Sequence, residues 1–247
     1  RNILGAPPGW VLHSYDYSQI EMRLAAHYSG DPNLIAVFTN EEDVHLMTAM
    51  LITGFSADKI TKELRKKAKA VNFGLIFSMG AYGLMEYAKV KYEVDMTIEE
   101  ATSWRKGFFE KYYKLPEWHR HQIDEARRTH QVVSMIGRVR HLNNMMSSDQ
   151  EAVAEAERQA INSPVQGLAS ALNLMSAVEV LRVLPRDEGR LAGLVHDQSL
   201  YLIRGDKSNY WEPIIRNIME NPPLYRFTSE RFLVPIKVES TVSEAWS

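Results

Sequence analysis

The sequence contains no cysteine and no long uninterrupted run of apolar residues. The first absence excludes disulfides and thiolate zinc sites, and it fits a reducing compartment. The second absence argues against a membrane-spanning helix, which needs roughly 20 apolar residues, and no segment has the pattern of a signal peptide. We therefore expect an intracellular protein, from a bacterium, a phage-infected cell or an organelle, with no membrane partner.

A large net charge is also missing, because the formal net charge is −2. A chain of this balance does not bind phosphates over its whole surface, so any phosphate binding must come from a local cluster. One such cluster is the segment KITKELRKKAKA at residues 59–70. The 247 residues, of which 45% are hydrophobic and 24% charged, are ordinary for a globular protein of one large or two smaller domains.

The hydrophobic pattern predicts a strand near the beginning of the chain, followed by helices. A β-rich run from Trp10 to Tyr15 ends at Asp16, and Ser18 can cap the helix that follows. The next helices are expected over residues 34–38, 43–53, 59–77, 82–92, 98–113 and 116–130. The first residues, RNILGAPPGW, begin within a loop without an initiator Met, so we expect this chain to be the last part of a longer one.

Two of these helices have identifiable capping residues. Ser56 or Asp58 can cap the helix over 59–77. Thr97 and Glu100 have the spacing of a capping box at the start of the helix over 98–113.

The rest of the chain mixes extended and helical patterns. A hairpin is expected over 131–143 with its turn at Gly137, then a helical stretch broken at Ser163 and Pro164. A second hairpin around Asp197, a helix over 209–220 and a β-rich segment at 232–240 follow. Strands at both ends with helices between them predict an α+β fold, in which an all-helical domain interrupts a sheet domain.

The second hairpin has an acid at its tip. In LAGLVHDQSLYLIRG, the apolar runs Leu191–Val195 and Ser199–Ile203 are separated by three polar residues that include Asp197. Aspartate is common in hairpin turns, so one interpretation is purely structural. The other is that the carboxylate is held there to bind a metal, because a carboxylate withdrawn from water needs a partner.

A helical stripe combines positive charge and aromatic rings. Arg65, Lys69, Phe73 and Phe77 recur every four residues, a spacing that keeps them on one slowly turning face of a helix. Basic side chains bind phosphates, and aromatic rings stack on a base or a sugar, so the stripe could hold a nucleoside triphosphate. The alternative is a solvated basic face with aromatics that enter the core.

Asp16 and Asp197 are each expected at the end or the turn of a β segment. If they are neighbours in space, their like charges favour a cation between them. Oxygen ligands without cysteine indicate Mg²⁺, with Mn²⁺ as a substitute. Two such ions are the usual arrangement for in-line phosphoryl transfer.

Four segments carry a resemblance to the DNA polymerase I family, family A. DYSQIEMRLAAHYSGD resembles motif A, RKKAKAVNFGLIFSMG resembles motif B and VHDQ resembles motif C. ERQAINSPVQGLAS resembles the family's helix that contacts the template-primer duplex. The order and spacing fit over essentially the whole chain, down to VPIKVESTVSEAW, and three ordered motifs are a specific signal.

The resemblance implies a right-hand polymerase fold. Its palm sheet would comprise residues 1–37 and 149–247, and an all-helical fingers domain would comprise 38–148. The thumb and any exonuclease region would precede residue 1. Implied partners are primer-template DNA, dNTPs and the missing thumb or exonuclease part of the same protein.

The resemblance also implies roles for individual residues. Asp16, Asp197 and the backbone carbonyl of Tyr17 would bind two Mg²⁺ ions. Glu21 would be the steric gate that excludes a ribose 2′-hydroxyl; without the motif it would be a surface acid. The other nucleotide-binding residues would be Arg65 and Lys69 at the triphosphate, with Lys69 also protonating the pyrophosphate, together with His45, Phe73, Phe77 and Gln19.

The expected DNA contacts lie in the second half of the chain. Arg158, Asn162 and Gln166 would reach the duplex, partly through the minor groove, whose acceptors all base pairs share. His196 would lie near the primer terminus. Without the resemblance, His45 would be interpreted as an ordinary helix residue.

Two positions depart from the family pattern. Phe77-Ser78 replaces Tyr-Gly in motif B, which removes a hydroxyl that in the family helps to position the gate glutamate. Gln198 replaces glutamate in motif C, which removes a charge beside the metals. Phage-type single-subunit RNA polymerases, which share this palm, also lack an acid there, so Gln198 is compatible with catalysis.

The expected function is template-directed DNA polymerisation, in which a primer 3′-hydroxyl attacks the α-phosphate of a dNTP. One alternative is a nucleotidyl transferase of relaxed sugar choice or an RNA polymerase, which Glu21 disfavours and Phe77 leaves open. The other is a catalytically silent template-primer binding protein, supported only by Gln198.

Overall fold

A computed structural model describes residues 5–245, and these form two compact units. Unit 1 comprises residues 5–21, 135–137 and 166–245, and unit 2 comprises 22–134 and 138–165. Two of the boundaries between the units fall inside helices, α1 (Ile20–Ser29) and α8 (Gln150–Val183), and the other two flank residues 135–137. The sequence had suggested boundaries after residues 37 and 148.

Unit 1 is built on a four-stranded antiparallel sheet in the order β4-β5-β1-β6. Its strands are β1 (Trp10–Tyr17), β4 (Gly189–Val195), β5 (Gln198–Arg204) and β6 (Val238–Ser243). The strand nearest the beginning of the chain is thus central, between β5 and β6. This order brings both ends of unit 1 into one sheet, as the α+β prediction required.

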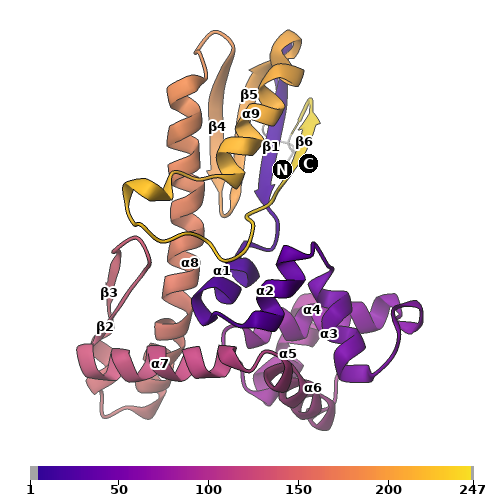
Figure 1. Ribbon diagram of the computed structural model, residues 1–247, viewed down its shortest axis with the longest axis vertical. Helices are drawn as coiled ribbons and strands as arrows, with labels where there is room; N and C mark the ends of the chain where they lie inside the picture. The colour runs from indigo at the N-terminus through magenta and orange to yellow at the C-terminus, as the bar shows by residue number, and fades with distance from the viewer. Residues whose placement is uncertain (1–4, 246–247) are drawn as a thin grey trace. The chain divides into compact units, whose positions relative to one another are not determined.

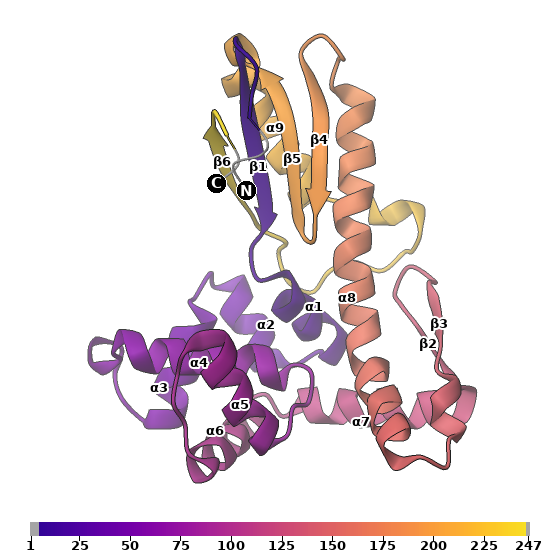
Figure 2. The same cartoon turned by 180° about the vertical axis from the view of Figure 1, so that it is seen from behind.

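Helices cover one face of this sheet. In Figure 1, α9 (Ser208–Glu220) lies in front of β5 and β1, and α8 runs alongside β4. Tyr15, Tyr17 and Tyr201 point to the covered face and are fully buried, which makes them a large part of the core of unit 1. Seen from behind, β1, β5 and β4 lie in front, and no described helix of unit 1 crosses them (Figure 2).

Successive side chains of each strand point alternately to the helix-covered face and to the other face of the sheet. Leu12, Leu200 and Leu202 form a small apolar cluster on this other face, and Ser14 and Asp16 continue the same row of β1.

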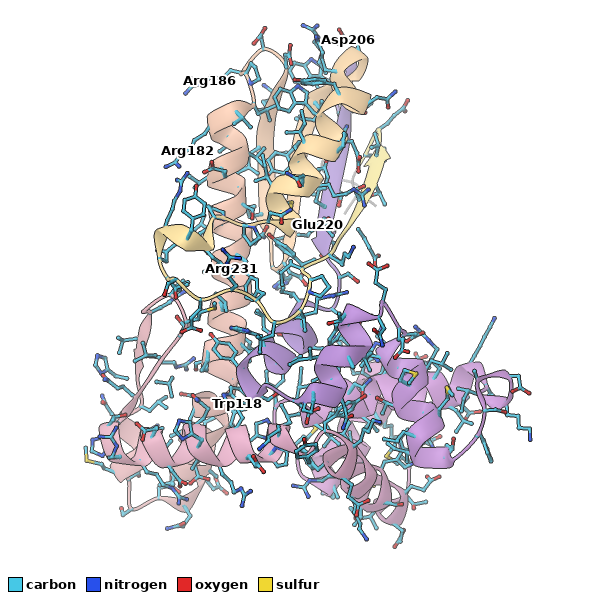
Figure 3. All side chains as sticks on the ribbon, viewed as in Figure 1. Trp118, Arg182, Arg186, Asp206, Glu220 and Arg231 are labelled. Carbon is cyan, nitrogen blue, oxygen red and sulfur yellow. The ribbon has the colours of Figure 1, made fainter. Side chains whose placement is uncertain are left out.

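Glu220, labelled at the end of α9 in Figure 3, accepts a hydrogen bond from Val238 N at 3.1 Å. This contact fixes the start of β6 beside β1.

Unit 2 is almost entirely helical. Besides parts of α1 and α8 it contains α2 (Pro32–Thr39), α3 (Val44–Thr53), α4 (Lys62–Leu75), α5 (Ala81–Tyr92), α6 (Ile98–Lys111) and α7 (Lys114–Thr129). A small hairpin of β2 (Gln131–Val133) and β3 (Val139–His141) follows α7. The short 3₁₀ helices of the chain are η1 (Ala57–Lys59), η2 (Asn143–Met146), η3 (Gly205–Lys207) and η4 (Leu224–Arg226).

Most expected helices and both hairpins are present, with ends shifted by a few residues. The capping box of Thr97 and Glu100 at the start of α6 is confirmed.

Trp118, labelled on α7 in Figure 3, stacks on Tyr28 of α1 with 5.8 Å between ring centroids. None of the described helices is long and apolar enough to cross a membrane.

The prediction for the basic helix was wrong at both ends. Neither Ser56 nor Asp58 caps it, because residues 57–59 form a separate 3₁₀ turn, and Thr61 accepts from Leu64 N instead. The helix ends at Leu75, so Phe77 lies beyond it and does not share the helical stripe of Arg65, Lys69 and Phe73.

Two further expectations were wrong, one for α8 and one for the segment 232–240. α8 runs unbroken through Pro164. The proline removes one backbone hydrogen bond, but the helix continues to Val183. The Ser18 hydroxyl donates to Glu239 Oε1 at 3.1 Å, and its capping of α1 stays a prediction. Of the β-rich segment 232–240 only residues from Val238 onward are in a strand.

Candidate functional site

The two aspartates of motifs A and C are brought together in unit 1. Asp16 pairs with Gln198 across β1 and β5, and Tyr17 N donates to the carbonyl oxygen of Asp197 at 3.4 Å. Asp16 and Asp197 therefore lie at the same end of neighbouring strands, although 181 positions separate them in the sequence (197 − 16). Asp16 is exposed and Asp197 is half-buried.

Asp197 occupies a two-residue turn between β4 and β5. Val195 pairs with Gln198, so only His196 and Asp197 remain in the turn. His196 is exposed and has φ 57°, a left-handed conformation that costs a non-glycine residue energy. Such conformations persist only where surrounding contacts enforce them.

Glu21 faces the same turn. It lines a cleft of about 540 Å³, formed within unit 1 by Ile20, Glu21, Gln166, Ala169, Ser170, His196 and Asp197. Burial and the negative charge of Asp197 raise the pKa of Glu21, and a hydrogen bond with Gln166 partly offsets this rise. The cleft thus combines the predicted sugar gate with one of the predicted metal ligands.

Tyr17 and Gln19 have different environments. The Tyr17 hydroxyl is buried on the helix-covered face, 2.9 Å from Ser176 Oγ, and it donates to Met219 O at 3.1 Å. Only the backbone carbonyl of Tyr17 is therefore suited to the predicted ligand role. Gln19 has φ 52°, and its buried Oε1 has no hydrogen-bond partner among the described residues.

Gln198, which departs from motif C, has a defined structural partner. Its Nε2 donates to Ser14 Oγ at 2.7 Å, on the same sheet face as Asp16. The amide is therefore used as a hydrogen-bond donor within the sheet, which a carboxylate could not provide.

The oxygen donors of this site fit a partly hydrated Mg²⁺ ion better than a metal held by protein ligands alone. The described residues contain no group of three or more His, Cys, Asp and Glu side chains that could hold a metal. Mg²⁺ is usually bound by one or two carboxylates, with water and substrate phosphates completing its shell. Asp16, Asp197 and the Tyr17 carbonyl supply this kind of partial, all-oxygen site.

In unit 2, Asp43 organises the basic residues. Its Oδ1 caps α3 by accepting from the backbone N–H groups of His45 and Leu46, and its Oδ2 accepts from Arg65 Nε at 2.6 Å. Burial favours the neutral acid, but the Arg65 hydrogen bond and the two backbone hydrogen bonds outweigh it and lower the pKa of Asp43. The contact with Asp43 uses only Nε of the Arg65 guanidinium group.

His45 is buried and held in one tautomer. Asn72 Nδ2 lies 3.3 Å from Val44 O, which can only accept, and 2.8 Å from His45 Nδ1. His45 Nδ1 must therefore accept, and the ring proton must be on Nε2. Burial, reinforced by Arg65 and Lys69, lowers the pKa of His45 to about 4 despite the opposing charge of Asp43, so the ring is neutral at pH 7.

The remaining predicted nucleotide-binding residues of unit 2 extend along α4 and past its end. Phe73 packs near His45, with 5.8 Å between ring centroids. Lys69 is exposed and forms no ion pair within residues 5–245; its Nζ lies 6.0 Å from the centroid of the Tyr92 ring. Phe77 is half-buried in the turn after α4, followed by Ser78 with φ 60°.

The expected DNA contacts recur along α8. Arg158, Asn162 and Gln166 are four residues apart, which puts them on one side of the helix. Arg158 is exposed and pairs with Glu155 at 2.6 Å. Asn162 Oδ1 is buried without a partner among the described residues, so this amide has unused hydrogen-bonding capacity.

Sequence reasoning missed Asp43 and Asn72, described above, and Asn173, whose amide donates to the carbonyl oxygens of His196 and Gln198. Asp43 precedes the first helical residue, Val44, so its capping position was a readable signal. Asn72 and Asn173 are buried amides in helices. A buried asparagine must find partners, but the sequence does not say which.

A family model described as DNA polymerase family A matches residues 1–247. The thermostable DNA polymerase I of Thermus thermophilus is 33% identical over 247 residues, which are 100% of this chain and 28% of the relative. DNA polymerase I of Aquifex aeolicus is 32% identical over 255 residues and is covered to 41%. The chain thus spans less than half the length of these relatives.

A solved structure gives the same result. The POL domain of Pol1 from M. smegmatis, in complex with DNA primer-template and dNTP, matches with a TM-score of 0.85 and 29% identity. The match covers 100% of this chain and 42% of that chain. The chain therefore belongs to DNA polymerase family A.

Proposed function

We propose that the protein is a template-directed DNA polymerase that extends a primer 3′-hydroxyl with dNTPs. The observation that carries the proposal is the pairing of β1 with β5, which puts Asp16 beside the Asp197 turn. Family membership over the whole chain supports the same activity. Unit 1 then has the role of the palm, and unit 2 has the role of the fingers.

Asp16, Asp197 and the Tyr17 carbonyl would hold two Mg²⁺ ions. When bound, these ions would stabilise the attacking and leaving oxygens of an in-line displacement. The chain's own contribution is to hold two carboxylates on a rigid sheet, one exposed and one in a tethered turn. Rigid elements position such ligands better than loops do.

Arg65, Lys69 and neutral His45 would bind the triphosphate of the incoming nucleotide. Arg65 is pre-oriented by Asp43, and His45 would donate its Nε2–H to a phosphate oxygen. Lys69, an exposed ammonium, would neutralise charge on the leaving pyrophosphate and donate a proton to it. Phe73 would pack against the sugar and base, and Gln19 and Phe77 would complete the nucleotide site.

Glu21 would select the sugar, because a half-buried side chain that lines the cleft beside Asp197 leaves little room for a ribose 2′-hydroxyl. Arg158, Asn162 and Gln166 would bind the duplex, and His196 the primer terminus. The minor-groove acceptors are shared by all base pairs, so contacts there suit an enzyme that copies any sequence.

Relaxed sugar choice is a second candidate, favoured by Phe77, which lacks the hydroxyl of the family's tyrosine. A catalytically silent protein is disfavoured, because Gln198 has a partner of its own in Ser14 and both aspartates are retained. We propose that the Gln198 amide stabilises the sheet next to Asp16 without ligating metal.

The test is primer extension by the protein in its full natural length, with Mg²⁺, a primed template, and dNTPs or rNTPs in parallel. Asp197→Asn keeps the shape of the side chain but removes its charge, and we expect it to slow extension at least about 100-fold. Asp206→Asn is the matched control, since Asp206, labelled in Figure 3, is an exposed acid of unit 1. It pairs with Arg204.

Extension with dNTPs alone, lost in Asp197→Asn but not in Asp206→Asn, supports the DNA polymerase proposal. Extension with both sugars that becomes dNTP-specific in Phe77→Tyr supports the relaxed-sugar candidate. Duplex binding without any extension by the unchanged protein would overturn the proposed activity.

A further inference from the structure

Asn173, on α8 in unit 1, is almost completely buried, with 2% of its surface exposed. Its Nδ2 donates to His196 O at 3.1 Å and to Gln198 O at 3.3 Å. Its Oδ1 accepts from Ser199 Oγ at 2.6 Å. One side chain thus holds the two carbonyl groups on either side of Asp197 and the residue that begins the buried part of β5.

These partners allow only one orientation of the amide. Two carbonyl oxygens require a donor, so the NH₂ group must face the turn. The Ser199 hydroxyl, which is fully buried, can then donate to the remaining Oδ1. The network is closed: each polar atom of the Asn173 side chain has a partner, and replacing either residue leaves buried polar groups unsatisfied.

The turn that Asn173 holds is unfavourable by itself. His196 has φ 57°, a conformation that favours glycine. The pairing of β4 with β5 shifts its register between Leu191 and Gly193, so the ladder leading to the turn is irregular as well. Asn173 ties the carbonyls of His196 and Gln198 to α8, a 34-residue helix, and these hydrogen bonds stabilise a turn whose own backbone conformation is unfavourable.

We propose that Asn173 is a positioning residue for Asp197, with Ser199 locking its amide. The proposal rests on the proposed function, in which Asp197 binds metal. Mg²⁺ demands near-ideal octahedral geometry, so a ligand on a turn that shifts by a fraction of an ångström binds it less well. Asn173 acts without touching metal or substrate, through the backbone on both sides of the ligand.

The test compares metal binding by the full-length protein and its variants, measured by Mn²⁺ electron paramagnetic resonance and by the Mg²⁺ dependence of extension. Asn173→Leu keeps the approximate volume but removes both the donor and the acceptor. Residues that orient metal ligands typically contribute 10–100-fold to metal affinity, and we expect a loss of about tenfold for Asn173→Leu. Extension at saturating Mg²⁺ should recover most of its rate.

Two further variants separate positioning from stability. Ser199→Ala removes the lock but leaves Nδ2 in place, so we expect a smaller loss of affinity, of a few fold. Val180→Ala shortens a fully buried side chain of α8 away from the turn and should lower stability without changing metal affinity.

Unchanged Mn²⁺ affinity in a folded Asn173→Leu protein would overturn the proposal, as would an equal loss in Val180→Ala. If Asn173→Leu does not fold, unchanged affinity in Ser199→Ala overturns it instead. Failure of the proposed function is distinguishable, because then Asp197→Asn would itself leave Mn²⁺ binding unchanged.

Discussion

Ser78 has φ 60° directly after Phe77, in the left-handed region that costs a residue with a Cβ about 1–2 kcal/mol. Glycine adopts this conformation at no steric cost, although it loses more chain entropy on folding. Ser78→Gly should therefore raise the free energy of unfolding by about 0.5–1 kcal/mol in urea titrations. Ser78→Ala, which keeps the Cβ, should give no such gain. An equal gain in both variants would show that the backbone conformation at Ser78 does not lower the stability.

At the level of single residues, sequence reasoning succeeded where a residue's place follows from a strand or a cap. Asp16 and Asp197 were each expected at the end or the turn of a β segment, and the strand register confirms this. Asn173 and its three partners were not predictable, since hydrophobic periodicity says which face is buried but not which polar groups meet there.

Pro164 lies inside α8, where proline removes one backbone hydrogen bond and crowds the carbonyl four residues earlier. Pro164→Ala should restore this bond and raise the free energy of unfolding by about 1–3 kcal/mol. The measurement is the urea midpoint, with Ser163→Ala as the neighbouring control. A lower midpoint for Pro164→Ala would mean that the buried ring fills space that alanine leaves empty.

The elements themselves were largely readable from hydrophobic periodicity, and α2, α3, α4 and α6 also have a side-chain cap. The errors have local causes. Proline is a strong statistical signal for a break, but the packing of a 34-residue helix outweighs it. The basic helix begins at Lys62 because Thr61 is the residue whose side chain actually caps it, and several polar residues upstream offered equally plausible caps.

At the scale of the molecule, acid sensitivity is expected to concentrate in unit 2. Burial lowers the pKa of both His45 and His119 to about 4, whereas an unfolded histidine titrates near 6.5. Between these values the unfolded chain binds protons that the folded chain does not. The contribution of each neutral histidine to the free energy of unfolding is therefore complete above pH 6.5. It is lost as the pH falls toward 4, by about 2 kcal/mol for each histidine at pH 5.

Urea unfolding at pH 7.5 and pH 5.0 checks this expectation. His119 Nε2 donates to Ile76 O at 2.9 Å, and the Gln side chain of His119→Gln can make the same hydrogen bond without titrating. The variant should lose about 2 kcal/mol less stability than the unchanged protein between the two pH values. The same pH dependence in both proteins would show that His119 is not the origin of the acid sensitivity.

The order of strands in unit 1 has a consequence for how the protein folds. β1 pairs with β5 and β6, whose residues follow it by more than 180 positions, whereas the helices of unit 2 pack mainly on their neighbours in the chain. Distant pairings form slowly, because the entropy of closing a long loop is lost before any contact is gained. Unit 2 can therefore acquire its structure while the sheet is still open. We therefore expect the two aspartates to meet late in folding, so that the proposed metal site forms only when the sheet closes.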